Sequence, residues 1–161
     1  MNDARPIANR FLDFAEKHGI RVNNPKLQAV LYFCYGNYLA TFEACLFAQE
    51  FEYTDWGPVI TVVNEQFEHL GEDPITGRVM VIDVKTGAYK EARRRISRTD
   101  SEFLDGMFEN IGFLDHRKLV GVMRAEGSAW HRFREGEIRC AFGKIKPDYI
   151  KQDFAHPAAY N

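Results

Sequence analysis

The segment from Leu27 to Leu39 is apolar around almost its whole circumference when drawn as a helix, and this constrains the fold more than any other part of the chain. Its main apolar face carries Leu27, Val30, Leu31, Cys34, Tyr38 and Leu39. Phe33 and Tyr35 lie off that face, so other elements must cover the helix on several sides. We therefore expect a central helix, with Asn24 as its N-cap and Pro25 in its first turn.

Five further helices are expected from the helical spacing of apolar residues and from start and stop signals. They are predicted at Pro6–His18, Pro58–Leu70, Thr99–Ile111, Asp115–Met123 and Pro147–Phe154. Thr99 and Glu102 have the spacing of a capping box, and Asp115 is expected to cap its own helix. The segment 128–134 is predicted as a short turn that presents Trp130 and Phe133.

One stretch changes from helical to strand-like spacing. Val79–Val84 is rich in β-branched residues, and Tyr89–Ile96 can pair back across a short turn as a β-hairpin. The preceding segment 42–53 is predicted as a loop with a short extended piece. These features predict a mainly α (α+β) fold: a compact single-domain bundle of about five or six helices with one β-hairpin inserted at about residues 76–96.

The length and the net charge of the chain limit the classes of protein to which it can belong. A chain of 161 residues fits one domain, predicted to span 1–161 with a frayed tail at 155–161. The net charge of −2 does not favour a general affinity for nucleic acid. We expect a cytoplasmic protein without a membrane partner, because the sequence shows neither a secretory signal nor an apolar run of membrane-spanning length. The three widely spaced cysteines predict free thiols in a reducing compartment.

Motifs for catalysis or metal binding are missing from the sequence. The five histidines are scattered, and the chain has no paired zinc ligands, phosphate-binding glycine loop or Gly-x-Ser-x-Gly motif. We predict no metal, no cofactor and no catalytic residue. An enzyme with a cysteine nucleophile is kept as a third alternative, after protein binding and DNA binding.

The turn Glu52–Val59 has two interpretations. In the first, it only starts a helix: Asp55 accepts hydrogen bonds from the free N–H groups, and Trp56 packs on the core. In the second, the same turn displays Tyr53 and Trp56 as anchors for a partner protein.

The basic run Arg93–Arg95 also has two interpretations. Lysines and arginines are common on the exposed edge of a hairpin, where they prevent edge-to-edge pairing. Alternatively, these arginines meet an acidic protein surface or phosphates.

Several motifs stand in a recognisable order. Lys26–Phe33 reads Lys-Leu-Gln-Ala-Val-Leu-Tyr-Phe, and Glu52–Val59 reads Glu-Tyr-Thr-Asp-Trp-Gly-Pro-Val. Ile7–Leu12 precedes them, and Leu119–Trp130 follows. In this order the chain resembles the SocA-like antitoxin (Panacea) family over about residues 5–155, with the hairpin region as a place where members differ in length.

The resemblance implies a protein that neutralises a cognate toxin, usually encoded beside it, by direct contact. In some relatives it implies an adaptor that hands the toxin to a protease, and others belong to phages or mobile elements. A DNA-binding regulator is the alternative, favoured by Arg93–Arg95 and by the autoregulation of such operons, but the predicted second and third helices are too apolar for a recognition helix.

The resemblance and the residue types together predict the partner contacts. The residues predicted to contact the partner are Lys26, Tyr53, Asp55, Trp56, Arg93, Arg94, Arg95, Arg124 and Trp130. Four of the matched positions depart from the family pattern. Thr54 stands where the family usually has Trp, and Trp56 stands where Tyr is common. Arg124 stands about where the family has His, and Met123 precedes it in place of Thr. If these positions touch the partner, this chain takes a different one from most relatives.

Overall fold

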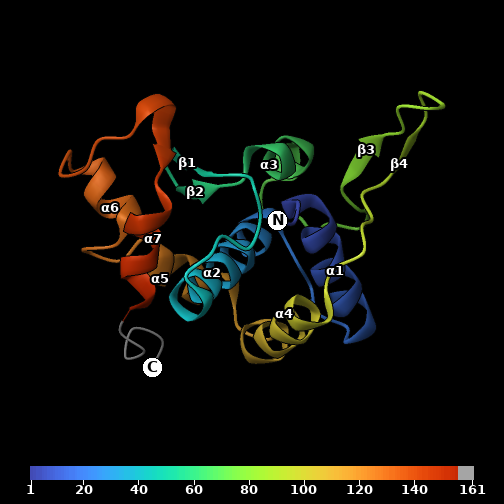
Figure 1. The fold of residues 1–161 in the computed structure, drawn as a ribbon, viewed down its shortest axis with the longest axis horizontal. Coiled ribbons are helices and arrows are strands. Elements are labelled where there is room, and N and C mark those ends of the chain that lie inside the picture. The colour runs from blue at the N-terminus through green and yellow to red at the C-terminus, as the bar shows by residue number, and fades with distance from the viewer. Residues whose placement is uncertain (156–161) are drawn as a thin grey trace.

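The computed structural model describes residues 1–155, which form seven α-helices and two small β-sheets (Figure 1). The helices are α1 (Ala4–Lys17), α2 (Asn24–Phe42), α3 (Thr61–Phe67), α4 (Arg98–Ile111), α5 (His116–Met123), α6 (Ala129–Arg134) and α7 (Pro147–Phe154). The strands are β1 (Phe51–Thr54), β2 (Gly57–Val59), β3 (Met80–Ile82), β4 (Tyr89–Glu91) and β5 (Lys144–Ile145). The predicted mainly α fold with some β structure is confirmed. All but Ala155 of the predicted tail lies outside the described residues.

Helix α2 is the central element, as its apolar circumference predicts. It contacts α1, α3, α4, α5, α7 and β2. Twelve of its residues between Asn24 and Gly36 are buried, polar ones included. Its N-cap is Asn23, whose side chain accepts from the Lys26 amide, and not Asn24 as predicted. Asn24 is unavailable as a cap because its side chain bonds to the neighbouring helix.

A chain of buried amides joins α2 to α3. The Ile60 N–H donates to Gln28 at 2.8 Å, and Gln28 donates in turn to Asn24 at 3.2 Å. Asn24 donates to Asn64 at 2.7 Å, and Asn64 donates to Glu68 at 3.1 Å. A buried amide left unpaired costs about 1–3 kcal/mol, so these bonds fix how the two helices meet.

The segment predicted to start the third helix forms a β-hairpin instead. β1 pairs antiparallel with β2, with Thr54 opposite Gly57, and β5 pairs on the other side of β1. Helix α3 begins only at Thr61, so Asp55 lies at the hairpin turn and does not cap it. Pro58 fits because β2 is an edge strand, where a missing N–H is tolerated. This second sheet was not predicted from the sequence.

Two further helix starts differ from the prediction. Ser97 caps α4 by accepting from the Asp100 amide, so the predicted Thr99 is already inside the helix. The segment predicted as a turn at 128–134 contains helix α6, which Ser128 caps by accepting from the His131 amide. The predicted Asp115 cap of α5 is confirmed.

The predicted hairpin at 76–96 is confirmed, with β3 and β4 paired antiparallel. It projects away from the helices (Figure 1). The fully buried Asn9 of α1 holds its base: the side chain donates to the carbonyls of Val79 and Ala92 at 2.9 Å and accepts from the Val79 amide at 2.7 Å. Farther out, Ile82 and Tyr89 are exposed.

Helix α7 packs on α2 where α2 has no side chain. A Cβ added at Gly36 would lie 2.0 Å from the Phe154 ring, so the ring rests directly on the α2 backbone. The ring also packs edge-on against Phe33 and tilted against Tyr32. Gly36 therefore sets how closely α7 approaches.

We expect Gly36→Ala to lower the free energy of unfolding by about 1 kcal/mol. Overpacking a core costs about 1–3 kcal/mol, whereas alanine favours a helix by about 1 kcal/mol over glycine. Urea titration measures the change. In a Phe154→Leu background, Gly36→Ala should become neutral or stabilising, and an equal loss in both backgrounds would contradict this contact.

Candidate functional site

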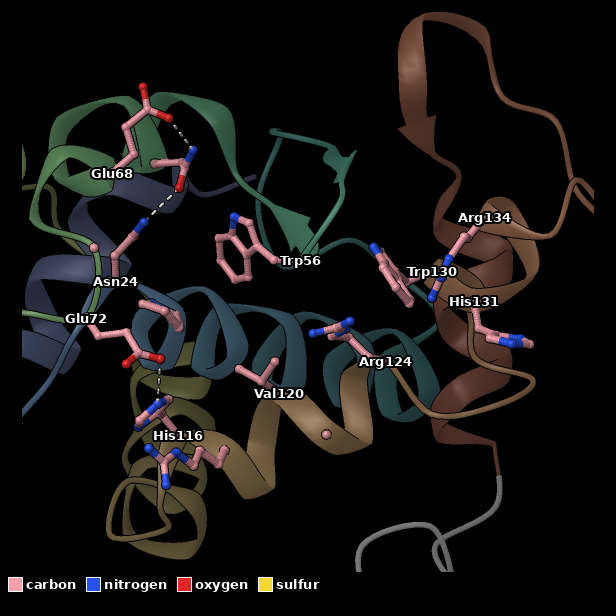
Figure 2. A pocket seen from close by; sticks show the side chains of 15 residues that line it. Asn24, Trp56, Glu68, Glu72, His116, Val120, Arg124, Trp130, His131 and Arg134 are labelled. Carbon is pink, nitrogen blue, oxygen red and sulfur yellow. Dashed lines mark hydrogen bonds and ion pairs between the residues drawn. The ribbon is translucent and has the colours of Figure 1, made fainter.

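A cavity of about 670 Å³ contains both tryptophans of the chain in its lining. We call it the tryptophan cavity. The side chains that line it come from α2, the β1–β2 turn, α3 and the segment after it, α5 and α6. They include Asn24 and Pro25 of α2, Trp56 of the β1–β2 turn, Asn64 of α3 with Glu68 and Glu72 after it, His116, Arg117 and Val120 of α5 with Arg124 after it, and Trp130 and Arg134 of α6. Figure 2 shows these side chains arranged along an elongated space, with Trp56 in its middle.

Trp130 forms one wall of the tryptophan cavity and is held from several sides. Its indole N–H donates to the Thr54 carbonyl at 2.8 Å. Tyr53 stacks on it with ring centroids 5.8 Å apart, and Phe133 stacks on Tyr53 at 5.0 Å. Trp130 is only 1% exposed. It is therefore a fixed platform and not a projecting anchor.

Two arginines lie over this platform. The guanidinium of Arg124 is 4.8 Å from the centroid of the Trp130 ring, and that of Arg134 is 5.6 Å away. Cations stack favourably on a tryptophan face. Within residues 1–155, neither Arg124 nor Arg134 has a carboxylate within ion-pair distance, whereas Arg132, which lies with Arg134 in α6, pairs with Glu137. This end of the tryptophan cavity is therefore basic.

The opposite end of the tryptophan cavity carries the carboxylates of Glu68 and Glu72, together with His116 and Arg117 from the first turn of α5. Glu68 accepts from Asn64 at 3.1 Å, and Glu72 lies 3.5 Å from Nε2 of His116. At that distance the imidazole has no well-formed bond, and Nε2 of His116 is a buried nitrogen without a hydrogen-bond partner in the described part of the chain. Figure 2 shows this group separated from Arg124 and Arg134 by Trp56 and Val120.

Helix α6, which carries Trp130, is tied to α7 and α2 through Asp153. The carboxylate accepts from the Tyr32 hydroxyl at 2.6 Å and from the Ala129 amide at 3.0 Å. Burial raises the pKa of Asp153 to about 6, although both hydrogen bonds act to lower it. Asp153 thus positions the wall of the tryptophan cavity.

The structure brings together four of the residues predicted to contact a partner. Trp56, Arg124 and Trp130 line the tryptophan cavity, and Tyr53 supports Trp130 from behind. Asp55 is exposed at the adjacent turn. These residues come from two segments far apart in the sequence.

Lys26 lies in a neighbouring hollow that also includes Asp115, Glu72 and His116. The residue is only 5% exposed. Burial lowers the pKa of Lys26, and the charge of the nearby Asp115 partly offsets this effect. Its surroundings are those of a buried cation at the start of α2, next to the glutamate end of the tryptophan cavity.

Arg93, Arg94 and Arg95 are not part of this site. They follow β4, at the other end of the molecule from α6 (Figure 1). Arg93 pairs with Asp13 and Glu91, and the hydrogen bond to Asp13, followed by that to Glu91, raises the pKa of Arg93. The positive charge of Arg93 is thus balanced by two carboxylates, whereas Arg94 and Arg95 are exposed.

Sequence reasoning missed Arg117, Arg134 and His116. A signal for Arg117 was present, because Arg117, Gly121 and Arg124 are spaced by four and three residues and so share one face around α5. Arg134 follows Trp130 by four residues, but this spacing carries meaning only once 129–134 is known to be a helix.

In residues 1–155, no three His, Cys, Asp or Glu side chains converge as ligands for a metal ion. None of the helices described there is both long and apolar enough to cross a bilayer. Cys34, Cys45 and Cys140 are free thiols, and burial raises the pKa of Cys34.

Comparison with known proteins gives a clear relative. The chain is 30% identical over 134 residues to Antitoxin SocA of Caulobacter vibrioides (strain NA1000 / CB15N), and the match covers 83% of this chain and 71% of that protein. The chain belongs to the SocA antitoxin family. No protein-family model matches it, and no solved structure does so either.

The Asp153 carboxyl should leave a pH signature on stability. Its pKa is about 6 in the folded chain, against 3.8 for the unperturbed group, so between these values the folded state holds a proton that the unfolded state has lost. Stability from this group is therefore greatest below pH 4 and falls as the pH rises through 6. Asp153→Asn keeps the shape and removes the titration.

We expect wild type to lose about 2 kcal/mol relative to Asp153→Asn between pH 4 and pH 7, from a shift of about two pKa units. Denaturant titrations at each pH measure this difference. Asp148→Asn is the matched control, since Asp148 is exposed on the same helix. A constant difference between wild type and Asp153→Asn at all pH values would contradict the prediction.

Proposed function

We propose that this chain is an antitoxin that neutralises a cognate toxin protein by direct contact. The observation that carries the proposal is membership of the SocA antitoxin family, at 30% identity over 134 residues. We further propose that it acts by binding and not by catalysis. In support, burial raises the pKa of the Cys34 thiol, which keeps it protonated and a poor nucleophile.

The structure supports a binding role through the tryptophan cavity. Arginine and tryptophan are the side chains most enriched among residues that dominate protein–protein affinity. Here Trp56 is partly buried, and Arg124 and Arg134 are exposed above Trp130. The hairpin β3–β4, with the exposed side chains of Ile82 and Tyr89, lies at the other end of the molecule (Figure 1).

Growth rescue tests the proposal. Each gene adjacent to that of this chain is expressed from an inducible promoter, alone and together with the chain. We expect one product to stop growth alone, to be neutralised when co-expressed, and to co-purify with the chain in a stable complex. If no neighbour is toxic, or if a toxic one is neither neutralised nor bound, the proposal fails.

The same cells distinguish a stoichiometric antitoxin from an adaptor. We propose that, where the chain acts as a protease adaptor, the half-life of the toxin shortens when the chain is present. A toxin that stays at constant abundance while growth is restored indicates inhibition by binding alone.

We expect Trp56→Ala to weaken toxin binding at least tenfold while lowering the free energy of unfolding by less than about 2 kcal/mol, because Trp56 is only partly buried. Calorimetric titration of the purified toxin and urea titration give the two values. Tyr89→Ala removes an exposed aromatic from the far hairpin and is the control. A larger effect of Tyr89→Ala on binding would place the interface at that hairpin.

A further inference from the structure

We propose that the tryptophan cavity receives an extended acidic segment of the partner protein, with a carboxylate at Arg124 and Arg134 and an apolar side chain beside Trp56. The proposal deepens the antitoxin function, since the toxin is the protein expected to supply the segment. Three properties of the tryptophan cavity carry it: the availability of its arginines, the separation of its charges, and its size.

Arg124 and Arg134 are available to bind carboxylates. Their guanidinium carbons lie over the Trp130 ring, 4.8 and 5.6 Å from its centroid. Within residues 1–155 neither arginine forms an ion pair, and both are exposed, so their N–H groups can form paired hydrogen bonds to a carboxylate. Because Tyr53 and the Thr54 carbonyl hold Trp130, this aromatic wall loses little side-chain entropy on binding.

The separation of charge favours an extended chain over a compact anion. The carboxylates of Glu68 and Glu72 line the end opposite Arg124 and Arg134 (Figure 2). A compact polyanion that filled the tryptophan cavity would meet these carboxylates as well as the arginines. An extended segment can place its acidic side chain at the arginine end and a backbone N–H or basic group at the glutamate end.

The middle of the tryptophan cavity is apolar. Trp56 lies on one side of it and Val120 on the other (Figure 2). The volume of about 670 Å³ is that of a site for a short stretch of chain, within the range of about 300–1,000 Å³ typical of ligand pockets. An aromatic or aliphatic side chain flanked by acidic residues matches this arrangement.

The chain reports on the tryptophan cavity without a label, because its two tryptophans both line it. The probe is a tryptophan-free hexapeptide of alternating glutamate and phenylalanine. We expect a saturable change in tryptophan fluorescence with this peptide, weakened by salt, and no saturable change with the matching lysine–phenylalanine peptide. The double variant Arg124→Glu with Arg134→Glu should bind the acidic peptide at least tenfold more weakly.

The control is Arg94→Glu with Arg95→Glu, which reverses two exposed arginines at the other end of the molecule and should bind as wild type does. Thermal unfolding confirms that both double variants fold. The proposal is overturned if the acidic peptide gives no saturable signal, if the lysine peptide binds equally well, or if adenosine triphosphate binds where the acidic peptide does not.

Growth rescue with the same variants separates the two proposals. Wild type and the Arg94/Arg95 variant should neutralise the toxin, and the Arg124/Arg134 variant should not. If the Arg124/Arg134 variant neutralises as well as wild type, the toxin binds elsewhere and the acidic-segment proposal is wrong, although the antitoxin function stands. If the acidic peptide binds but wild type neutralises no neighbouring product, the antitoxin function fails and the peptide preference stands.

Discussion

The burial of α2 on nearly all sides is the constraint on which the rest of the structure depends. A helix without a polar face must be enclosed, and six other elements meet it. Two residues of α2 determine two of those contacts. Gly36 has no side chain and so leaves room for the Phe154 ring, and the buried side chain of Gln28 accepts from the backbone N–H of Ile60, just before α3. The apolar burial supplies stability, and these two local features determine the direction in which α3 and α7 leave the centre.

The tryptophan cavity follows from that arrangement. Asn24 and Pro25 bring the first turn of α2 to its edge, while α3 and α5 leave α2 on different sides. Asp153 then connects α7 to the start of α6, so that Trp130 faces the β1–β2 turn. Arg124 and Arg134 lie at the end of α5 and in α6, whereas Glu68 and Glu72 lie in the segment that follows α3, so the separation of these charges is a property of the packing and not of any one segment. A partner that complements both ends must bind in a single direction.

Elements with strong local signals were predicted well, and elements decided by distant partners were not. Asp115 caps α5 as expected because capping is a contact over two or three residues. A turn followed by Pro58 is typical of a helix start, but residues 57–59 form strand β2 of a hairpin with β1. This hairpin forms because β1 gains a second partner in β5, some ninety residues later in the chain. Trp130 was expected to be displayed, yet it is covered, since Tyr53, Arg124 and Arg134 surround it. The sequence presents Arg93 as part of a basic run, but in the folded chain it pairs with Asp13 of α1.

The way Asn9 holds the projecting hairpin has an evolutionary consequence. Its single carboxamide bonds to the chain on both sides of the hairpin, at Val79 and Ala92, and so closes off the base as an additional rung of the ladder would. Met80, the next residue along, bonds to Gln66 of α3 as well, and the hairpin turn beyond it projects away from the helices (Figure 1). Insertions or deletions at that turn, between Ile82 and Tyr89, can therefore accumulate without disturbing the core, which makes the end of this arm the part of the molecule best suited to diversify between lineages.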